Sequence, residues 1–474
     1  MNEDFDNNFD DEELSLVNQF EEMQTKSSSY FFDIEELEVI IDYYFDKDQL
    51  LKAQQVIKFA LKIYPDSTSF LLKKAQLYSM LEQADKAFDL LNQIENLEPY
   101  NPEIYVTRAS LFNQKGNHQQ AVEELTKALE YTDDVEDNIE LYQNIAYEYE
   151  NLNNYQEAIN YLKKAHTLDE KDKSVLFELA YCYESCNQTE ESISSFKKII
   201  AIDPYSKTAW FNLGVSYSTM GLFEKAIECY DYAIAIDEKF SSAYFNKANA
   251  LSSLEQFDEA IEIYREVLQF ETPDALTHYY IGECYQKIQQ LDAAIDQYRT
   301  ALEINPKMAD AYVGIGVCHE LLGQDVDALK CFLTASEIEP ANPEYWYLLG
   351  LLQHKHSMND DAIFSYQKVI ESDQSNKMIW LDYSSIYNEL GEYDKAINIL
   401  SEGIKLFPNM ADLQYRLSIY LFNKGSMKEA YVIMDKALQL DADKHTTLFE
   451  YQPELKNIPE IIDLISNYQP KNIS

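Results

Sequence analysis

Small side chains return along this chain at a fixed interval. Ala53, Ala87 and Ala121 are 34 residues apart, and the next member, Ala158, follows after 37 residues. The interval of 34 then holds for the rest of the series, which consists of Ser192, Ala226, Ala260, Ala294, Ala328, Ala362, Ala396 and Ala430. A period of this length predicts stacked supersecondary units, each covering an apolar face of its neighbour.

The pattern inside one period predicts two helices. In residues 207–240 the first half places, at i, i+3, i+4 and i+7 on one helical face, Trp210, Leu213, Gly214 and Tyr217. The second half places apolar residues in the same way, at Ala226, Tyr230 and Ala233. Gly221 lies between the two halves and suits a tight turn. A connection this short predicts an antiparallel helical hairpin.

A second series of small residues marks the first helix of each unit. Its members are Ala75, Ala109, Ala146, Ala180, Gly214, Ala248, Gly282, Gly316, Gly350, Ser384 and Ser418. We expect helices to approach closely at both series, since a larger side chain would overpack the contact at a cost of roughly 1–3 kcal/mol. The three extra residues between Ala121 and Ala158 fall within 132–138, which we place in a turn between units. An acidic contact loop is the alternative.

The order of residues in each unit is an aromatic, then Leu-Gly, Tyr, Ala, an aromatic, Ala and a late Pro. This order resembles the tetratricopeptide repeat, and the likeness extends over twelve repeats in residues 34–444. The resemblance implies an all-α fold, a right-handed α-solenoid (superhelix) of antiparallel helix pairs. It also implies that the first helices line a concave groove that binds peptides or partner proteins. We divide the chain into an acidic head (1–30), the repeats (31–444) and a C-terminal capping helix and tail (445–474).

Both ends of the chain lack the period. The head is acidic with little apolar content, so we expect disorder over 1–30. A short docked helix is the alternative, because apolar residues are spaced three apart at Leu14, Val17, Phe20 and Met23. The head could also occupy the groove. After Lys444, Pro459 suits a helix start, and a cap is expected because the last repeat otherwise exposes an apolar face.

Charge and composition restrict the partners. The chain has 38 Lys and Arg against 83 Asp and Glu, a formal net charge of −45, which repels nucleic acid. This charge serves solubility, favours a partner with basic residues, or does both. The start lacks a basic and apolar leader, and no run of about 18 apolar residues predicts a membrane span. Six cysteines without a framework spacing suit a reducing compartment. We expect a cytoplasmic protein with no nucleic-acid partner and no membrane insertion.

The chain shows no pattern for catalysis. A phosphate loop, a zinc signature and a nucleophile elbow are all missing from the sequence. Cys182 and Cys186 are four residues apart on one helix and are the best metal candidate. However, Cys182, Cys284 and Cys318 share one repeat position that suits a small buried residue, so packing explains them better. We predict no enzyme, no cofactor and no metal.

The predicted groove contains an aromatic position. When the first helices are aligned, one inner position holds Phe177, Phe211, Phe245, Tyr279 and, two repeats later, Tyr347. Neighbouring inner positions hold Tyr181, Glu184, Asn249 and Glu283. Exposed rings beside acidic groups suit Lys or Arg, and an Asn amide can pair with a peptide backbone. The alternative is that the rings only pack against neighbouring first helices.

Two functions are consistent with these patterns. The first is a non-catalytic adaptor that binds a segment of a partner protein, with basic residues, in the groove. The alternative is a structural scaffold that self-associates or organises a multiprotein assembly through its convex face and ends. The sequence leaves the identity of the partner and the oligomeric state open.

Overall fold

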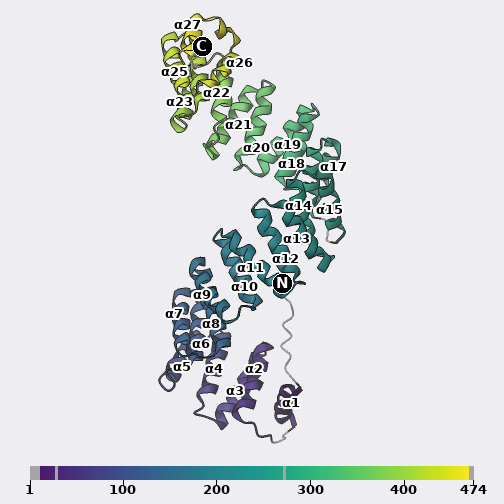
Figure 1. Cartoon of the computed structure of the whole chain (residues 1–474), viewed down its shortest axis with the longest axis vertical. Coiled ribbons are helices and arrows are strands. Elements are labelled where there is room, and N and C mark those ends of the chain that lie inside the picture. Colours follow the sequence, from purple (N-terminus) through teal and green to yellow (C-terminus); the bar gives the residue numbers. More distant parts are fainter. Residues whose placement is uncertain (1–10, 27–29, 271–273, 469–474) are drawn as a thin grey trace. The chain divides into compact units, whose positions relative to one another are not determined.

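The computed structural model describes residues 11–26, 30–270 and 274–468, and within these ranges the regular structure is helical with no strand (Figure 1). The predicted all-α fold is confirmed. The chain divides into two compact units, residues 1–243 and 244–474, and the division falls within α14 (Ser241–Ser253). Each unit is described by itself.

Twelve successive helix pairs make up the repeats in the described part of the chain, and the two helices of each pair contact one another as a hairpin. The first helices are α2 (Ile34–Asp46), α4 (Thr68–Met80), α6 (Pro102–Gln114), α8 (Val135–Asn151), α10 (Lys173–Ser185), α12 (Lys207–Thr219), α14, α16 (Ala275–Lys287), α18 (Ala309–Leu321), α20 (Pro343–Lys355), α22 (Ile379–Glu389) and α24 (Ala411–Lys424). The second helices are α3 (Leu50–Ile63), α5 (Ala84–Glu95), α7 (His118–Glu130), α9 (Tyr155–Leu168), α11 (Thr189–Ile202), α13 (Phe223–Ile236), α15 (Phe257–Phe270), α17 (Leu291–Ile304), α19 (Asp325–Ile338), α21 (Asn359–Ser372), α23 (Tyr393–Leu406) and α25 (Met427–Leu440). Each unit is therefore an α-solenoid of helix pairs, and every member of the second-helix series from Ala53 to Ala430 is buried, as predicted.

The turn inside every hairpin uses one left-handed residue. Five repeats place Gly there, as the sequence predicts for Gly221, whose φ is 72°. The other seven place a residue with a side chain in the same conformation: Asp48, Glu82, Asn153, Asn187, Glu255, Gln289 and Ser357. The repeat geometry therefore imposes this backbone conformation even where the local sequence does not favour it.

The three extra residues lengthen a helix rather than a turn. α8 has 17 residues where most first helices have 13, and it begins at Val135 with Asp134 as its N-cap. The Asp134 carboxylate accepts hydrogen bonds from the backbone N–H groups of Glu136 and Asp137. The expectation of an enlarged turn is wrong here, because a capping aspartate starts the helix one turn early.

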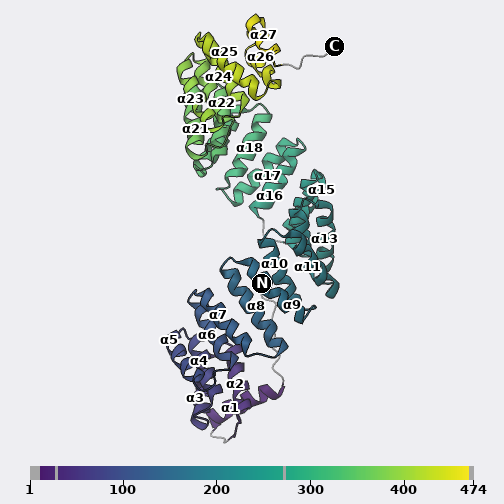
Figure 2. The same ribbon diagram turned by 60° about the vertical axis from the view of Figure 1, so that its left-hand side comes forward.

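The head is helical over α1 (Asp11–Lys26), which lies against α2 at the N-terminal end of the first unit (Figure 2). Val17 and Phe20 are buried there, and the Phe20 ring meets that of Phe59 on α3 at 5.6 Å. Glu21 forms an ion pair of 2.8 Å with Lys52. The expectation of disorder is thus wrong for residues 11–26, because their apolar side chains cover the exposed end of the first repeat. The rest of that prediction falls on residues 1–10 and 27–29, which lie outside the described residues.

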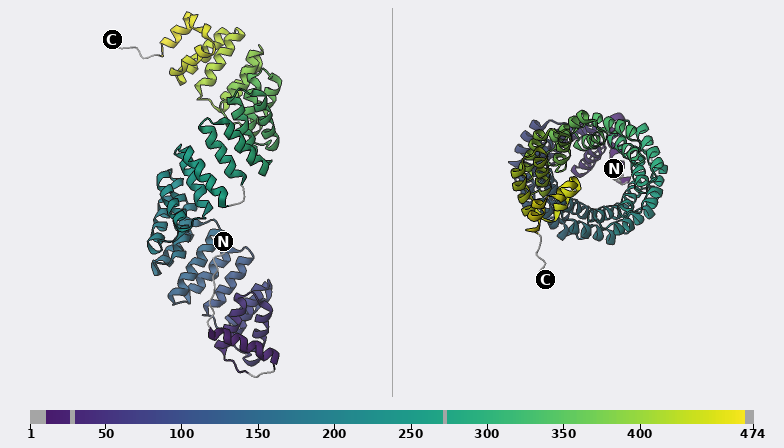
Figure 3. Two further views of the ribbon diagram at one scale, coloured as in Figure 1. Left: turned by 90° about the vertical axis from the view of Figure 1, so that its right-hand side faces the viewer. Right: turned by 90° about the horizontal axis from the view of Figure 1, so that it is seen from above.

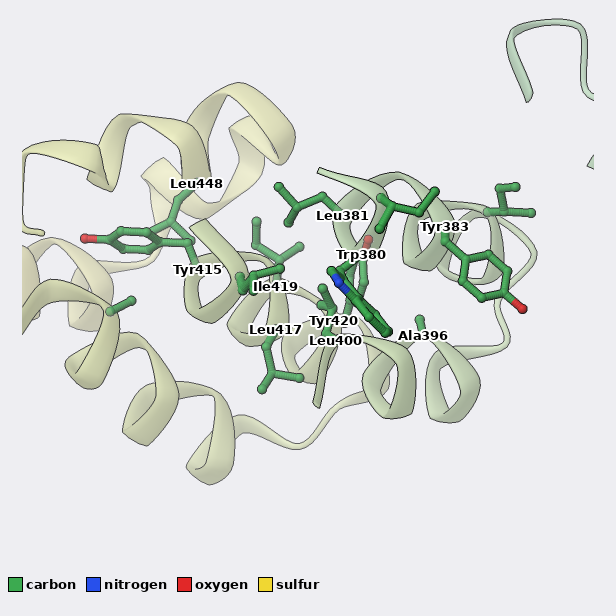
Figure 4. Packing of buried hydrophobic residues seen from close by; sticks show 14 of the residues in the cluster. Trp380, Leu381, Tyr383, Ala396, Leu400, Tyr415, Leu417, Ile419, Tyr420 and Leu448 are labelled. Atoms are coloured by element: carbon green, nitrogen blue, oxygen red, sulfur yellow. The ribbon is translucent and has the colours of Figure 1, made fainter. Parts of the chain in front are cut away.

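The other end of the array carries short helices, α26 (Thr446–Tyr451) and α27 (Pro459–Ser466), with 3-10 turns before each (Figure 3). Their buried side chains are Leu448, Leu455, Ile461 and Ile465. These belong to the same core as Trp380, Leu400 and Tyr420, which come from α22, α23 and α24 (Figure 4). The C-terminal segment therefore continues the apolar core beyond the last repeat.

Candidate functional site

The aromatic series singled out in the sequence is half-buried rather than exposed. Phe177, Phe211, Phe245, Tyr279 and Tyr347 each pack on an aromatic ring of the second helix in their own repeat. The ring pairs, with centroid distances, are Phe177–Phe196 (6.1 Å), Phe211–Tyr230 (5.9 Å), Phe245–Tyr264 (5.7 Å), Tyr279–Tyr298 (5.6 Å) and Tyr347–Tyr366 (6.3 Å). The expectation of an exposed aromatic strip is therefore wrong. Each of these rings is partly covered by a ring on the second helix of its own hairpin. Phe177 and Phe211 belong to the first unit, and the remaining three to the second.

Glu184 joins two repeats. Its carboxylate accepts hydrogen bonds from the hydroxyls of Ser216 at 2.7 Å and Ser192 at 3.0 Å, and both serines are buried. Three other pairs, also 32 residues apart, make the same link: Cys182 to Glu150, Cys284 to Ser252 and Cys318 to Gln286. Burial raises the pKa of all three of these cysteine thiols, to about 11 for Cys284 and Cys318. The links give these cysteines packing and hydrogen-bonding roles between repeats.

Three carboxylates on the first helices lie half-buried and form no ion pair among the described residues. Glu178 accepts from Gln143 at 2.9 Å, Glu283 from Tyr279 at 3.0 Å and Asp382 from Tyr347 at 2.6 Å. Burial raises the pKa of each carboxyl, and these hydrogen bonds oppose the rise. Lys287 near Glu283, and Arg416 and His354 near Asp382, also oppose the rise, but from outside ion-pair distance. A half-buried charge whose hydrogen bonds come from neutral donors gains from a closer cation, so each of these carboxylates can accept a Lys or Arg side chain.

Exposed aromatic rings occur one helical turn away from the predicted series. Tyr181 is 52% exposed and touches Tyr155 edge-on, with ring centroids 6.2 Å apart. Tyr147 stands 34 residues earlier, at the same register on the preceding first helix, and is 56% exposed. The sequence reasoning missed Tyr147, although its register with Tyr181 could have shown it. Asn249 shares this register in the second unit, and its side-chain oxygen accepts a hydrogen bond from Tyr264.

A pocket of about 380 Å³ opens on α6 and α8 of the first unit. Glu103, Asp137 and Glu140 give it three carboxylates, while Val106 and Leu141 supply apolar surface, and its lining contains no Lys or Arg. Glu103 is exposed as a residue, but partial desolvation of its carboxyl raises the pKa of that group. The nearby charge of Lys73 opposes this rise. The early start of α8 contributes Asp137 to this pocket, which the sequence reasoning did not foresee.

We define the first-helix face of the first unit by Glu103, Val106, Glu140, Tyr147 and Tyr181. Val106 occupies the same repeat position as Phe177, and Gln76, which also lines the pocket, has the register of Tyr147 and Tyr181. The face thus combines the acidic pocket with two exposed rings. Such a surface suits an extended segment that carries both basic and apolar side chains.

Within the ranges that the structure describes, no three His, Cys, Asp or Glu residues come together as a metal site. No helix there is long and apolar enough to cross a membrane.

Stacked hairpins with an open, acidic face define a helical-repeat protein of the kind that contacts other proteins. Tetratricopeptide repeat models match residues 101–171, 152–213 and 208–240, and a model described as the cilia and flagella-associated protein 70 C-terminal domain matches residues 238–449. The chain belongs to the tetratricopeptide repeat family, as the sequence pattern predicts. No curated protein matches the sequence.

Several solved structures are similar to parts of the chain. YrrB, described as a TPR protein with an unusual peptide-binding site, is 22% identical with a TM-score of 0.32, and the match covers 39% of this chain and 95% of that one. MamA is 25% identical with a TM-score of 0.33, covering 36% and 93% respectively. A tetratricopeptide repeat protein from Parabacteroides merdae is 18% identical with a TM-score of 0.41, covering 53% and 99%.

Proposed function

We propose that this protein is a non-catalytic adaptor that binds a basic segment of a partner protein on its first-helix face. The observation that carries the proposal is the pairing of the acidic pocket at Glu103 and Glu140 with the exposed rings of Tyr147 and Tyr181. Exposed tyrosines supply apolar contact and attract cations by their ring faces, and carboxylates complement Lys and Arg. The predicted partner with basic residues suits this surface.

The groove residues singled out in the sequence have different roles in this proposal: some contact the partner directly and others support the surface. Tyr181 remains a direct contact because its ring is exposed. Glu178 adds a half-buried carboxylate on the same helix, α10. Phe177 and Phe211 lie between the two helices of their hairpins, where their rings pack on rings of the second helices, so they hold the first helices in place. In the second unit, Glu283 with Tyr279 and Asp382 with Tyr347 form two further places for a cation.

A paired capture experiment tests the proposal. Full-length wild type, Tyr147→Ser/Tyr181→Ser and Tyr232→Ser serve as baits in lysate of the source cells, and bound proteins are identified by mass spectrometry. Tyr232 lies on the second helix α13 and is 55% exposed. The control substitution Tyr232→Ser therefore removes an equally exposed ring that lies outside the first-helix face. We expect a partner captured by wild type and Tyr232→Ser to be lost with the double variant.

The same partner should be lost with Glu103→Gln/Glu140→Gln, which keeps the side-chain volume but removes two charges. Circular dichroism should show equal helicity for all the baits, because every substituted tyrosine and glutamate is exposed. Identical captures from all baits would contradict the proposal and favour the alternative scaffold, in which the second-helix side or the ends make the contacts.

A further inference from the structure

A second pocket, of about 670 Å³, lies between α3 and α4 and has the opposite charge. Lys58, Lys62 and Lys74 line it, and no carboxylate does. Among the described residues none of these three lysines forms an ion pair. In a chain with a formal net charge of −45, three unpaired lysines around one pocket are an exception to the general surface.

The register of the repeats explains why Lys74 lacks a partner. One repeat further along, Arg108 takes the position of Lys74 and is only 8% exposed. Its guanidinium donates to Glu95 at 2.6 Å and to Glu124 at 3.0 Å. The residues 34 positions before these two glutamates are Leu61 and Leu90. The first two repeats therefore keep a cation at this position but replace both of its acceptors with leucines.

The inner wall of the pocket is apolar. Ile57 and Leu77 are buried, Leu61 is half-buried, and Tyr78 lies beside them. The ammonium of Lys74 lies 5.8 Å from the centre of the Tyr78 ring, and that of Lys86 lies 5.6 Å from it on a neighbouring helix. A ligand here can bury an apolar side chain against Ile57 and Leu77 while its charges face the lysines.

We propose that this pocket binds an acidic segment of a partner protein that carries an apolar anchor. The charge complementarity favours carboxylates, and a volume of about 670 Å³ has room for several side chains of one segment. The net charge of the whole chain disfavours a polyanion such as nucleic acid or an extended anionic membrane, whose many charges would meet the acidic remainder of the surface. A short acidic segment meets mainly the local lysines.

The repeats provide a matched control site. Lys197 and Lys225 lie 5.7 and 5.5 Å from the centre of the Tyr217 ring. These residues occupy the repeat positions of Lys58, Lys86 and Tyr78, but the equivalents of Lys74 and Lys62 there are Leu213 and Ala201. The variant Lys197→Glu/Lys225→Glu therefore removes two exposed lysines beside a tyrosine without touching the pocket.

Fluorescence anisotropy with full-length protein tests the proposal. The probe is a labelled peptide of alternating Glu and Leu, compared with a peptide of alternating Glu and Ser and with a labelled oligo-dT. We expect Lys58→Glu/Lys62→Glu, and more mildly Lys58→Gln/Lys62→Gln, to weaken binding of the Glu-Leu peptide by at least about tenfold. Lys197→Glu/Lys225→Glu and Tyr147→Ser/Tyr181→Ser should leave it within about twofold, so this result is separable from that of the first-helix face.

Three results would overturn the proposal. The first is an absence of Glu-Leu binding, and the second is equal loss in the pocket and control variants. The third is binding of the Glu-Ser peptide or oligo-dT as tight as that of the Glu-Leu peptide, which would reduce the pocket to a patch of charge without an apolar anchor.

Discussion

The ring of Tyr298 lies directly against Gly282, and a Cβ on that glycine would come 2.7 Å from Tyr298 Cε1. On its other side the same ring meets Gly314, where a Cβ would come 2.5 Å from Tyr298 Cζ. The small residue of the first helix is therefore matched in size to the aromatic residue of the second. Gly316 is matched to Phe332 in the same way.

This contact predicts that Gly282→Ala destabilises the second unit. The ring is held from both sides and cannot retreat, so overpacking of about 1–3 kcal/mol outweighs a helix-propensity gain of up to about 1 kcal/mol. Urea unfolding followed by circular dichroism measures the change. Tyr298→Leu should restore part of the loss in the double variant, as in the second repeat, where Ala75 and Leu91 occupy these positions. Additive effects of the two substitutions would contradict this size matching.

The link from Glu184 to Ser216 makes a second prediction. Glu184→Ala leaves two buried serines without their shared acceptor, which we expect to cost about 1–2 kcal/mol of unfolding free energy. Glu184→Gln retains an acceptor and should cost clearly less. Exposed Glu190, also in the fifth repeat, provides the control as Glu190→Ala. If Glu184→Ala leaves stability unchanged but weakens partner capture, the residue acts in binding rather than between repeats.

The half-buried carboxyl of Asp382 gives a pH dependence. Burial raises its pKa in the folded state, so the folded protein binds this proton more readily than the unfolded chain does. The charged form therefore costs stability above the folded pKa, and the cost disappears as the pH falls toward the unfolded value of about 3.9. We expect Asp382→Asn to raise the melting temperature at pH 7 by about 1–3 °C, with a gain that shrinks toward pH 4. Calorimetry across this range, with exposed Asp296→Asn as control, checks the sign; a gain that grows on acidification would refute it.

The left-handed turn residue offers a stabilising substitution. Glu255 has a φ of 60°, a conformation that costs a residue with a side chain about 1–2 kcal/mol. Glu255→Gly removes this strain but increases the entropy of the unfolded chain, so we expect a net gain of about 0.5–1 kcal/mol. Thermal unfolding measures this gain in stability. The comparison variant is Glu259→Gly, a substitution inside α15 that should destabilise the protein by a similar amount. Equal losses for both variants would show that this turn carries no strain.

Sequence and structure agree most closely where the repeat itself is the signal. The series from Ala53 to Ala430 located the close helix contacts in every repeat, because the same packing recurs every 34 residues. They disagree where one residue changes a local outcome. Asp134 starts α8 a turn early, and Val17 and Phe20 dock a helix whose composition is mainly polar.

The sequence by itself determined the family, the all-α fold and the register of the repeats, because periodic small and aromatic residues encode contacts between helices that are close along the chain. Only the tertiary structure decided which side chains remain accessible. The rings in the register of Phe177 are covered by their own second helices, whereas Tyr147 and Tyr181 are not. The lysine pocket likewise depends on Leu61 and Leu90 standing where the next repeat has glutamates. Exposure and charge balance depend on what a neighbouring helix presents across the contact, and a single helix pattern does not contain that information.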